Sequence, residues 1–102
     1  MSRDLARIAQ ARDLAGPDVE LYVDANGGYG RKQAVRVMEA AADYDVRWFE
    51  EPVSSDDLIG LRMVRDAVRA DVAAGEYGGD LTYFQRMCAA GAVDCLQADA
   101  SR

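Results

Sequence analysis

Trp48–Pro52, with the sequence WFEEP, decides how the rest of this 102-residue chain is interpreted. An apolar pair runs into two carboxylates and a proline, which is typical of a buried strand that ends in a loop. Two further apolar runs end on an acid, at Asp24 and Glu76, which lie 26 residues before and 26 residues after Glu50. This spacing is about one strand, one helix and two loops. It therefore predicts that the three acids lie at the same end of neighbouring parallel strands.

Predicted helices and strands alternate through the whole chain. Apolar residues at helical spacing predict helices over residues 3–15, 31–44, 54–69 and 81–90, and short apolar runs predict strands over residues 20–24, 46–50, 71–76 and 93–98. The predicted class is α/β, with about four consecutive parallel strands and intervening helices. A closed eight-stranded barrel needs roughly 250 residues. The chain is therefore either a partial (β/α) barrel of the TIM type or an open four-stranded sheet.

Charge and composition argue against nucleic-acid and membrane partners. The net charge is -6, and the 12 basic residues are scattered among 18 acidic ones, which leaves no basic surface for phosphate. No apolar run approaches the roughly 18 residues that span a bilayer, and the first residues do not form a signal peptide. We therefore expect a cytoplasmic protein. In that compartment the two cysteines, Cys88 and Cys95, are expected to be reduced and buried.

Three strand-end carboxylates, from Asp24, Glu50 and Glu76, are predicted to form a metal site. Mg²⁺ prefers oxygen ligands, and the sequence contains no histidine that would favour a softer metal. Each acid taken alone could instead cap the following helix or lie solvated in a loop, but the equal spacing favours a shared site. Because successive strand side chains face opposite sides of a sheet, Glu50 and Glu51 cannot both be ligands, and the spacing favours Glu50.

Residues beside these acids are candidates for contact with a substrate or for support of the ligands. The candidates of this kind are Asn26, Glu51 and Tyr77. Asn26 alternatively makes only a local turn. Tyr29 and Tyr83 either line a substrate pocket together with Tyr77 or simply cover the end of a barrel.

The remaining polar candidate is Asp99, which ends the last predicted strand and would join the same rim. An acid at this position could orient a base, but the chain has no histidine. Its single lysine, Lys32, lies at a helix start and is expected to be solvated. Strand alternation places Trp48 on the same face as Glu50, in the layer below the predicted metal.

Four short motifs resemble, in order and spacing, the barrel domain of the enolase superfamily. The closest branch is the one named for mandelate racemase and muconate lactonizing enzyme. The motifs are VDANG at residues 23–27, WFEEP at 48–52, AGE at 74–76 and LQAD at 96–99. Together they extend over essentially the whole chain, and the set of four is specific although each motif alone is weak.

The resemblance implies an enzyme that removes the proton α to a substrate carboxylate and stabilises the resulting enolate on Mg²⁺. The metal ligands would be Asp24, Glu50 and Glu76, and Asp99 would be a catalytic residue that hydrogen-bonds a histidine on the next strand. A glutamate at position 76 resembles the racemase and acid-sugar dehydratase branch more than the cycloisomerase branch. We therefore expect an acid-sugar dehydratase, with a racemase or epimerase of the same family as the alternative.

The chain also departs from the family pattern. The family's lysine base would precede residue 1, its histidine would follow residue 102, and we expect residues 1–102 to lack the N-terminal capping domain. Residues 1–102 therefore resemble a fragment of the C-terminal barrel domain, expected to be inactive alone, of an enzyme that we expect to be a homo-oligomer. The alternative from another functional class is a free-standing α/β module that binds a metal or a partner without catalysis.

Overall fold

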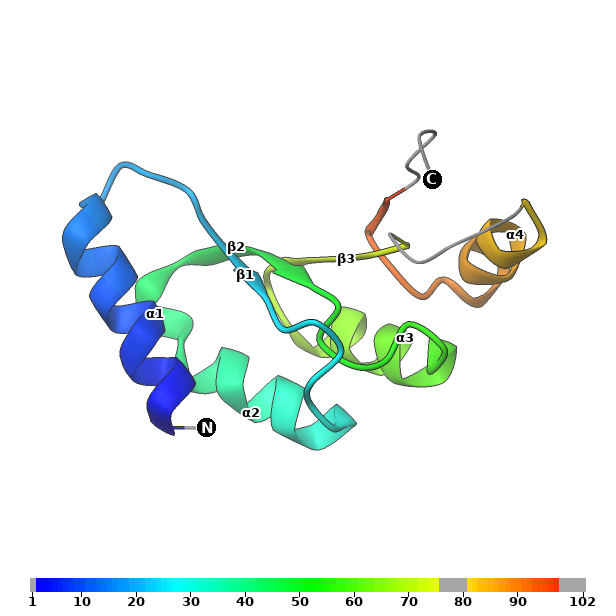
Figure 1. Ribbon diagram of the computed structural model, residues 1–102, viewed down its shortest axis with the longest axis horizontal. Helices are drawn as coiled ribbons and strands as arrows, with labels where there is room; N and C mark the ends of the chain where they lie inside the picture. The colour runs from blue at the N-terminus through cyan, green and yellow to red at the C-terminus, as the bar shows by residue number, and fades with distance from the viewer. Residues whose placement is uncertain (1, 76–80, 98–102) are drawn as a thin grey trace.

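The computed structural model describes residues 2–75 and 81–97 of the chain. The elements follow in the order α1 (Ser2–Ala15), β1 (Leu21–Asp24), α2 (Arg31–Ala40), the 3-10 helix η1 (Ala42–Tyr44), β2 (Val46–Glu50), α3 (Leu58–Ala67), β3 (Asp71–Ala74), α4 (Leu81–Ala90) and β4 (Cys95–Leu96). The four strands form one parallel sheet in chain order (Figure 1). This arrangement confirms the α/β class and is that of consecutive units of a (β/α) barrel. Within the described residues, no helix is long and apolar enough to cross a membrane.

The sheet has one apolar face, which packs on helices, and an opposite face that carries the aromatic side chains of Tyr22 and Trp48. In Figure 1, α1, α2 and α3 lie on one side of the strands. Phe49 of β2 points to that side and is fully buried in one cluster with Leu61 and Val64 of α3. Burial of such side chains stabilises the fold by about 1.5–3 kcal/mol each. On the opposite face Tyr22 stacks on Trp48, with ring centroids 5.5 Å apart, while Tyr22 remains 58% exposed.

The start of α3 shows how a local hydrogen bond decides a helix boundary. The serine-rich segment at residues 54–57 forms a turn, in which the N–H of Asp57 donates to the carbonyl oxygen of Ser54 at 2.9 Å. Asp57 is the N-cap, because its carboxylate accepts from the N–H of Gly60 at 3.1 Å. The helix consequently begins at Leu58, four residues later than the sequence pattern predicts.

The predicted helix over residues 31–44 is in fact two helices. Regular α2 ends at Ala40, Ala41 leaves the helical conformation with φ −89° and ψ 7°, and η1 follows. Asp45 then adopts a left-handed conformation. The side chain of Arg12 on α1 donates hydrogen bonds to the carbonyl oxygens of Tyr44 and Asp45 at 3.0 and 3.3 Å. These long-range contacts satisfy carbonyl groups that a continued helix would have used.

The last two strands are shorter than the sequence pattern predicts. β3 ends at Ala74, and β4 contains only Cys95 and Leu96. Gly75 follows β3 with φ 123°, a conformation that other residues rarely adopt. A Cβ atom at this position would lie 2.6 Å from the carbonyl oxygen of Gln97. The glycine therefore permits the close approach between the end of β3 and the chain after β4.

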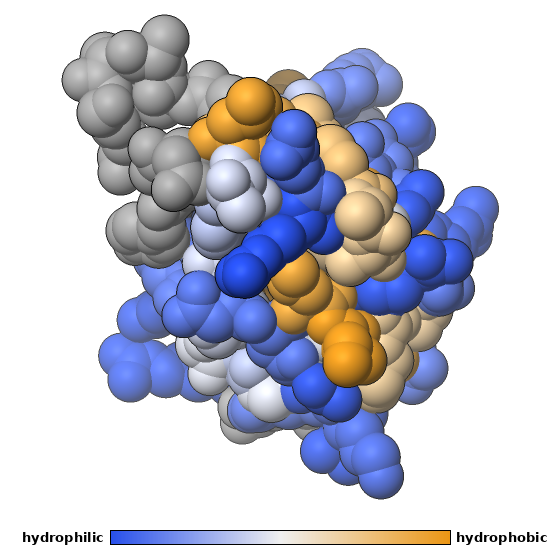
Figure 2. Space-filling view, turned by 90° about the vertical axis from the view of Figure 1, so that its right-hand side faces the viewer, coloured by the Kyte–Doolittle hydropathy of each residue, from blue (hydrophilic) through white to orange (hydrophobic). Residues whose placement is uncertain are grey.

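The outer surfaces of α3 and α4 carry several apolar side chains. Viewed from the side of the molecule where these helices lie, the surface is mostly hydrophilic, with a few hydrophobic patches (Figure 2). The exposed large apolar residues of the two helices are Ile59, Met63 and Leu81. Cys88 on α4 is also exposed, and Cys95 is only half-buried. Both thiols are free, but the prediction that they are buried is wrong, because Met87 rather than Cys88 occupies the inner face of α4.

Candidate metal centre at the carboxyl ends of the strands

Two of the three predicted ligands lie side by side at one edge of the sheet. Asp24 is the last residue of β1 and Glu50 is the last residue of β2. The two are direct partners in the parallel ladder between these strands. Opposed residues of neighbouring parallel strands have side chains on the same face. Both carboxylates therefore extend from the same face at the same end of the sheet, on the face that also carries Trp48.

The carboxylate of Glu50 is held by two side chains. The indole Nε1–H of Trp48 donates to Glu50 Oε1 at 3.3 Å, and the amide Nε2–H of Gln97 donates to the same oxygen at 2.8 Å. Trp48 precedes Glu50 by two residues on the same strand, so the expected shared face is confirmed. Among the described residues, no hydrogen bond is donated to Oε2.

Asp24 is exposed and begins the glycine-rich loop after β1. Its Oδ1 accepts a hydrogen bond at 2.9 Å from the backbone N–H of Asn26, which has a positive φ of 50°. This contact makes a local turn through the backbone N–H of Asn26 and does not involve its side-chain amide. The loop is also joined to the end of β2. The N–H of Gly27 donates to the carbonyl oxygen of Glu51 at 2.7 Å, and the N–H of Tyr29 donates to that of Pro52 at 3.2 Å.

Glu51 has an environment opposite to that of Glu50. It is 1% exposed, whereas Glu50 is half-buried, and it has a positive φ of 43°. Its side chain lines a polar cavity of about 290 Å³, together with Asn26, Gly27, Ser54, Ser55, Asp56 and Tyr83. The expectation that the two adjacent glutamates diverge is therefore confirmed. The cavity also brings Asn26 and Tyr83 next to Glu51, so three of the residues proposed for substrate contact or support are neighbours.

Tyr29 is directed away from the two strand-end acids. Its hydroxyl donates to Asp4 of α1 at 2.6 Å, and its ring lies 6.3 Å from that of Phe49 on the helix-covered side. Burial, together with the hydrogen bond to Asp4, raises the pKa of Tyr29 to about 12. The phenol therefore stays protonated at neutral pH and anchors the end of the loop rather than lining a substrate pocket.

A charged pair joins the first turns of α2 and α3. Arg31 donates to both carboxylate oxygens of Asp57, at 2.8 and 2.5 Å. The hydrogen bond from Arg31 lowers the pKa of Asp57, and the backbone N–H of Gly60 acts in the same direction. Lys32, the neighbour of Arg31, is exposed as expected. The pair fixes the helices that follow the two acid-bearing strands relative to each other.

The other predicted site residues lie outside the described part of the chain. These are Glu76, the third proposed ligand, together with Tyr77 and Asp99. Within residues 2–75 and 81–97, no group of three or more acidic, histidine or cysteine side chains is arranged to hold a metal ion. Two of the three predicted ligands, Asp24 and Glu50, thus lie in the described part of the chain.

Sequence reasoning missed Gln97 as a member of this site. Glu50 pairs with Ala73 of β3, which in turn pairs with Cys95 of β4, so Gln97 lies two residues farther along the same face. The sequence contained a signal for this residue, because Gln97 belongs to the LQAD motif at 96–99. Strand alternation backwards from Asp99 would have placed Gln97 on the ligand-bearing face.

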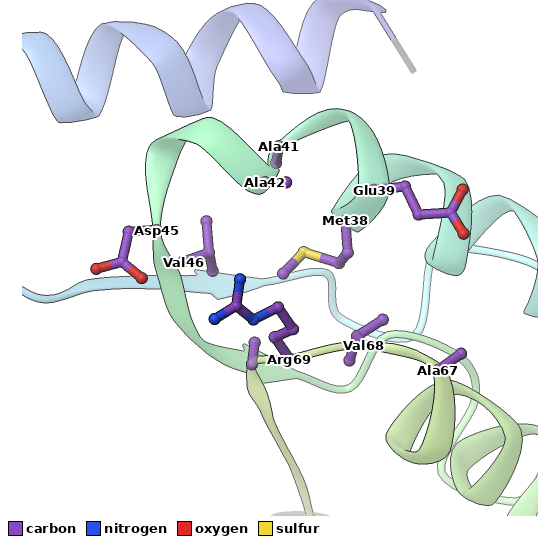
Figure 3. Close-up of a pocket in the computed structure, with 10 residues that line it drawn as sticks. Met38, Glu39, Ala41, Ala42, Asp45, Val46, Ala67, Val68 and Arg69 are labelled. Atoms are coloured by element: carbon purple, nitrogen blue, oxygen red, sulfur yellow. The ribbon is translucent and has the colours of Figure 1, made fainter.

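A second pocket lies at the opposite end of the strands. It has a volume of about 290 Å³ and lies between the ends of α2 and α3 and the start of β2 (Figure 3). Apolar residues such as Met38, Val46 and Val68 form most of its wall, with Glu39, Asp45 and Arg69 as its charged residues. Val46 is the first residue of β2 and Glu50 the last, so this pocket is separate from the carboxylate end.

Comparison with known proteins agrees with the motifs. The family model described as "Enolase C-terminal domain-like" matches residues 1–102. D-galactarolactone cycloisomerase of Agrobacterium fabrum is 40% identical over 100 residues, which are 97% of this chain and 26% of that protein. L-galactonate dehydratase of Hypocrea jecorina is 34% identical over 107 residues, and the match covers 100% of this chain and 24% of that protein. A hydrophobic dipeptide epimerase of Enterococcus faecalis is 34% identical over 93 residues, with 91% and 26% covered.

Solved structures give the same result. A mandelate racemase/muconate lactonizing enzyme-like protein from Rubrobacter xylanophilus has a TM-score of 0.90 and 44% identity, covering 99% of this chain and 28% of that one. An enolase from Bradyrhizobium, in complex with magnesium and mandelic acid, has a TM-score of 0.89 and 36% identity, covering 94% and 27%. The chain thus spans about a quarter of the length of the relatives it matches. By sequence and by fold, it belongs to the enolase C-terminal domain-like family of mandelate racemase and muconate lactonizing enzymes.

Proposed function

We propose that residues 1–102 are a segment of the C-terminal barrel of a Mg²⁺-dependent enzyme that removes the proton α to a substrate carboxylate. The observation that carries this proposal is the register of the sheet. Asp24 and Glu50 end adjacent parallel strands as direct partners, so two carboxylates reach the same edge. In barrels of this architecture, the carboxyl ends of the strands are where the chemistry occurs.

The residues present suit a hard divalent cation. The donor atoms are carboxylate oxygens, which Mg²⁺ prefers, and no histidine competes for a softer metal. Glu50 offers one oxygen that is already hydrogen-bonded and one that receives no hydrogen bond from a described residue. Asp24 is exposed and keeps a second oxygen beyond the one that accepts from Asn26. In the proposal, Glu76 is the third ligand.

The chain would supply the charge-neutralising half of the reaction. Bound Mg²⁺ would neutralise the negative charge that develops on the substrate carboxylate as the α proton leaves. Asp24 and Glu50 would hold and orient the cation. The base needs a pKa near the working pH, for which histidine and a pKa-lowered lysine are the usual groups. This chain has no histidine, and Lys32 is exposed on α2, so the proposal assigns the base to other parts of the enzyme. In that arrangement, Asp99 would orient a histidine.

For the substrate, we propose an acid sugar and dehydration as the reaction. Loss of the α proton and of the β hydroxyl as water gives an enol, which becomes an α-keto acid. The similarity to L-galactonate dehydratase supports this choice. Return of the proton to the same carbon would instead make the enzyme a racemase or epimerase, and the similarity to a dipeptide epimerase favours that alternative.

The proposal is tested on the full-length protein with Mg²⁺ and a panel of acid sugars in D₂O. Nuclear magnetic resonance would follow the α hydrogen, and the α-keto acid would be measured separately. We expect keto-acid formation in the wild type and its loss in Asp24→Asn. Asp43→Asn, an exposed acid on η1, is the matched control and should keep full activity. Exchange of the α hydrogen without keto acid would indicate the epimerase, and neither signal with any acid would contradict the proposal.

The alternative of a non-catalytic module makes a different prediction for the isolated chain. Size-exclusion chromatography and thermal unfolding would show a discrete, cooperatively folded species if the chain were a free-standing module. A segment of a larger barrel should aggregate or lack a cooperative transition, because half a barrel leaves unpaired strand edges and an open sheet face. The 58% exposure of Tyr22 on that face supports the segment.

A further inference from the structure

Gln97 makes a long-range contact with the proposed metal ligand Glu50. Its amide Nε2 lies 2.8 Å from Glu50 Oε1, although the two residues are 47 positions apart in the sequence. The contact crosses β3, because Glu50 ends β2 whereas Gln97 follows β4. An ionised carboxylate can only accept hydrogen bonds, so the amide must present its NH₂ group to Glu50.

Trp48 brings a second donor to the same oxygen. Its Nε1 lies 3.3 Å from Glu50 Oε1, so one hydrogen bond from β2 and one from the residue after β4 meet at one atom. Two such bonds restrict rotation of the carboxylate about its terminal torsion, which is otherwise soft. They also occupy the lone pairs of Oε1, and Oε2 receives no hydrogen bond from the described residues.

The backbone around Gln97 is itself fixed to β3. The N–H of Gln97 donates to the carbonyl oxygen of Ala74 at 2.8 Å. Only a glycine at position 75 permits the close approach of the segment after β3 to the segment after β4. The amide Oε1 of Gln97 is buried and accepts no hydrogen bond from the described residues. A buried polar atom of this kind is unfavourable for stability alone and is typical of groups retained for a binding site.

We propose that Gln97 is a positioning residue that, with Trp48, restricts Glu50 to coordination through one oxygen and thereby favours Mg²⁺ over Ca²⁺. The inference rests on the proposed metal site. Mg²⁺ requires near-octahedral geometry with short bonds, whereas Ca²⁺ accepts six to eight oxygens and commonly binds both oxygens of a carboxylate. A carboxylate with one oxygen already hydrogen-bonded therefore suits Mg²⁺ better than Ca²⁺.

The test compares the affinities of Mg²⁺ and Ca²⁺ by calorimetry, using full-length protein stripped of metal and without substrate. Gln97→Met keeps the length of the side chain but removes the donor. We expect Mg²⁺ to bind about 10–100-fold more weakly, as is typical when a hydrogen-bond partner of a metal ligand is lost. Ca²⁺ should be affected less, so the ratio of Mg²⁺ to Ca²⁺ affinity should fall. Gln10→Met on the exposed face of α1 is the matched control and should change neither affinity.

A second variant keeps the test decisive if Gln97→Met does not fold. Trp48→Phe removes the other donor and retains an aromatic ring for the stack on Tyr22, so the same ratio should fall, but less, because the Trp48 contact is longer. Thermal unfolding would verify that each variant is folded. An unchanged ratio in the folded variants would overturn the positioning role, including the case in which both affinities fall equally. If the wild type binds no Mg²⁺, the proposed metal site itself is wrong.

Discussion

The two ends of the sheet differ in the way their residues are held together. At the carboxyl ends, polar groups from three segments of the chain converge: Gln97 and Trp48 donate to Glu50, and the loop after Asp24 is bonded to the backbone of Glu51. At the amino ends, a pocket of similar volume is mostly apolar. One end thus holds hydrogen-bonded polar side chains, including the proposed metal ligand Glu50, whereas the other end is mostly apolar. Parallel (β/α) barrels show the same division.

The largest expected effect is the lack of activity in the isolated chain, which contains the carboxyl ends of these four strands without the rest of a barrel. The isolated chain should show no α-proton exchange and no dehydration, even with saturating Mg²⁺, because no histidine or buried lysine is present to act as base. Nuclear magnetic resonance in D₂O with acid sugars is the measurement. Exchange above a protein-free control, abolished by Asp24→Asn, would show that the carboxyl end is sufficient without the missing bases.

Separate substitutions of two adjacent glutamates test which of them holds the metal at the carboxyl ends of the strands. In the full-length protein, Glu50→Gln should abolish turnover, because the charge of a metal ligand is lost. The affinity for Mg²⁺ should fall by more than the roughly 10–100-fold expected for loss of a supporting hydrogen bond. Glu51→Gln should have a smaller effect on Mg²⁺ affinity, since its side chain lies in the separate polar cavity. Calorimetry decides between them. Loss of the metal in Glu51→Gln but not in Glu50→Gln would reverse the assignment.

A change at the amino end should affect stability without affecting metal binding. Met38→Ala should lower the free energy of unfolding by about 2–3 kcal/mol, because it enlarges the apolar pocket and removes a buried side chain. The Mg²⁺ affinity of the folded variant should be that of the wild type. Urea unfolding and calorimetry on the same preparation measure the two quantities. A large fall in Mg²⁺ affinity would show that the two ends are coupled.

The smallest expected effect concerns the cap of α3, which lies near the carboxyl end but outside the ligand set. Asp57→Ala should cost about 1 kcal/mol of stability at pH 7, since it removes the N-cap. Asp57→Asn keeps a good cap and removes only the charge that pairs with Arg31.

The pH dependence of this pair follows from the lowered pKa of Asp57. A lowered pKa means that ionised Asp57 stabilises the folded state above its unfolded value of about 4. The contribution is lost as the pH falls through the still lower folded value. The difference in stability between the wild type and Asp57→Asn should therefore disappear in acid. A difference that persists at a pH low enough to protonate Asp57 in the folded state would point to a contribution other than charge.

The part of the fold that was predictable depends on local and periodic signals. The spacing of 26 residues correctly placed Asp24 and Glu50 in register, and the run from Val46 to Glu50 was predicted with its correct ends. Both results follow from alternation and from the fixed length of a strand-helix unit. Glu76, the third acid of that spacing, lies outside the described residues, so its place at the site remains a prediction.

The features that sequence reasoning missed depend on contacts between distant segments. Helix α2 stops at Ala40 where Arg12, from a different helix, bonds to the carbonyl groups that follow. Alternation backwards from Asp99 gives the face of Gln97, but it does not give the hydrogen bond to Glu50, which crosses β3 and joins residues 47 positions apart. The exposure of Cys88 depends on which face of α4 meets α3. The apolar residues of this short helix lie on more than one face, since Met87 is buried and Leu81 is exposed, so the sequence alone does not determine that face.

The indole of Trp48 has an optical consequence. It is the single tryptophan of this chain, so its emission can be assigned to one position within these residues. Its N–H donates to the carboxylate oxygen of Glu50, so a dication placed on that carboxylate changes the electric field at the fluorophore. In a background without other tryptophans, a fluorescence titration with Mg²⁺ should shift or quench this emission. The Asp24→Asn variant, which retains the indole contact, should require a higher Mg²⁺ concentration for the same change.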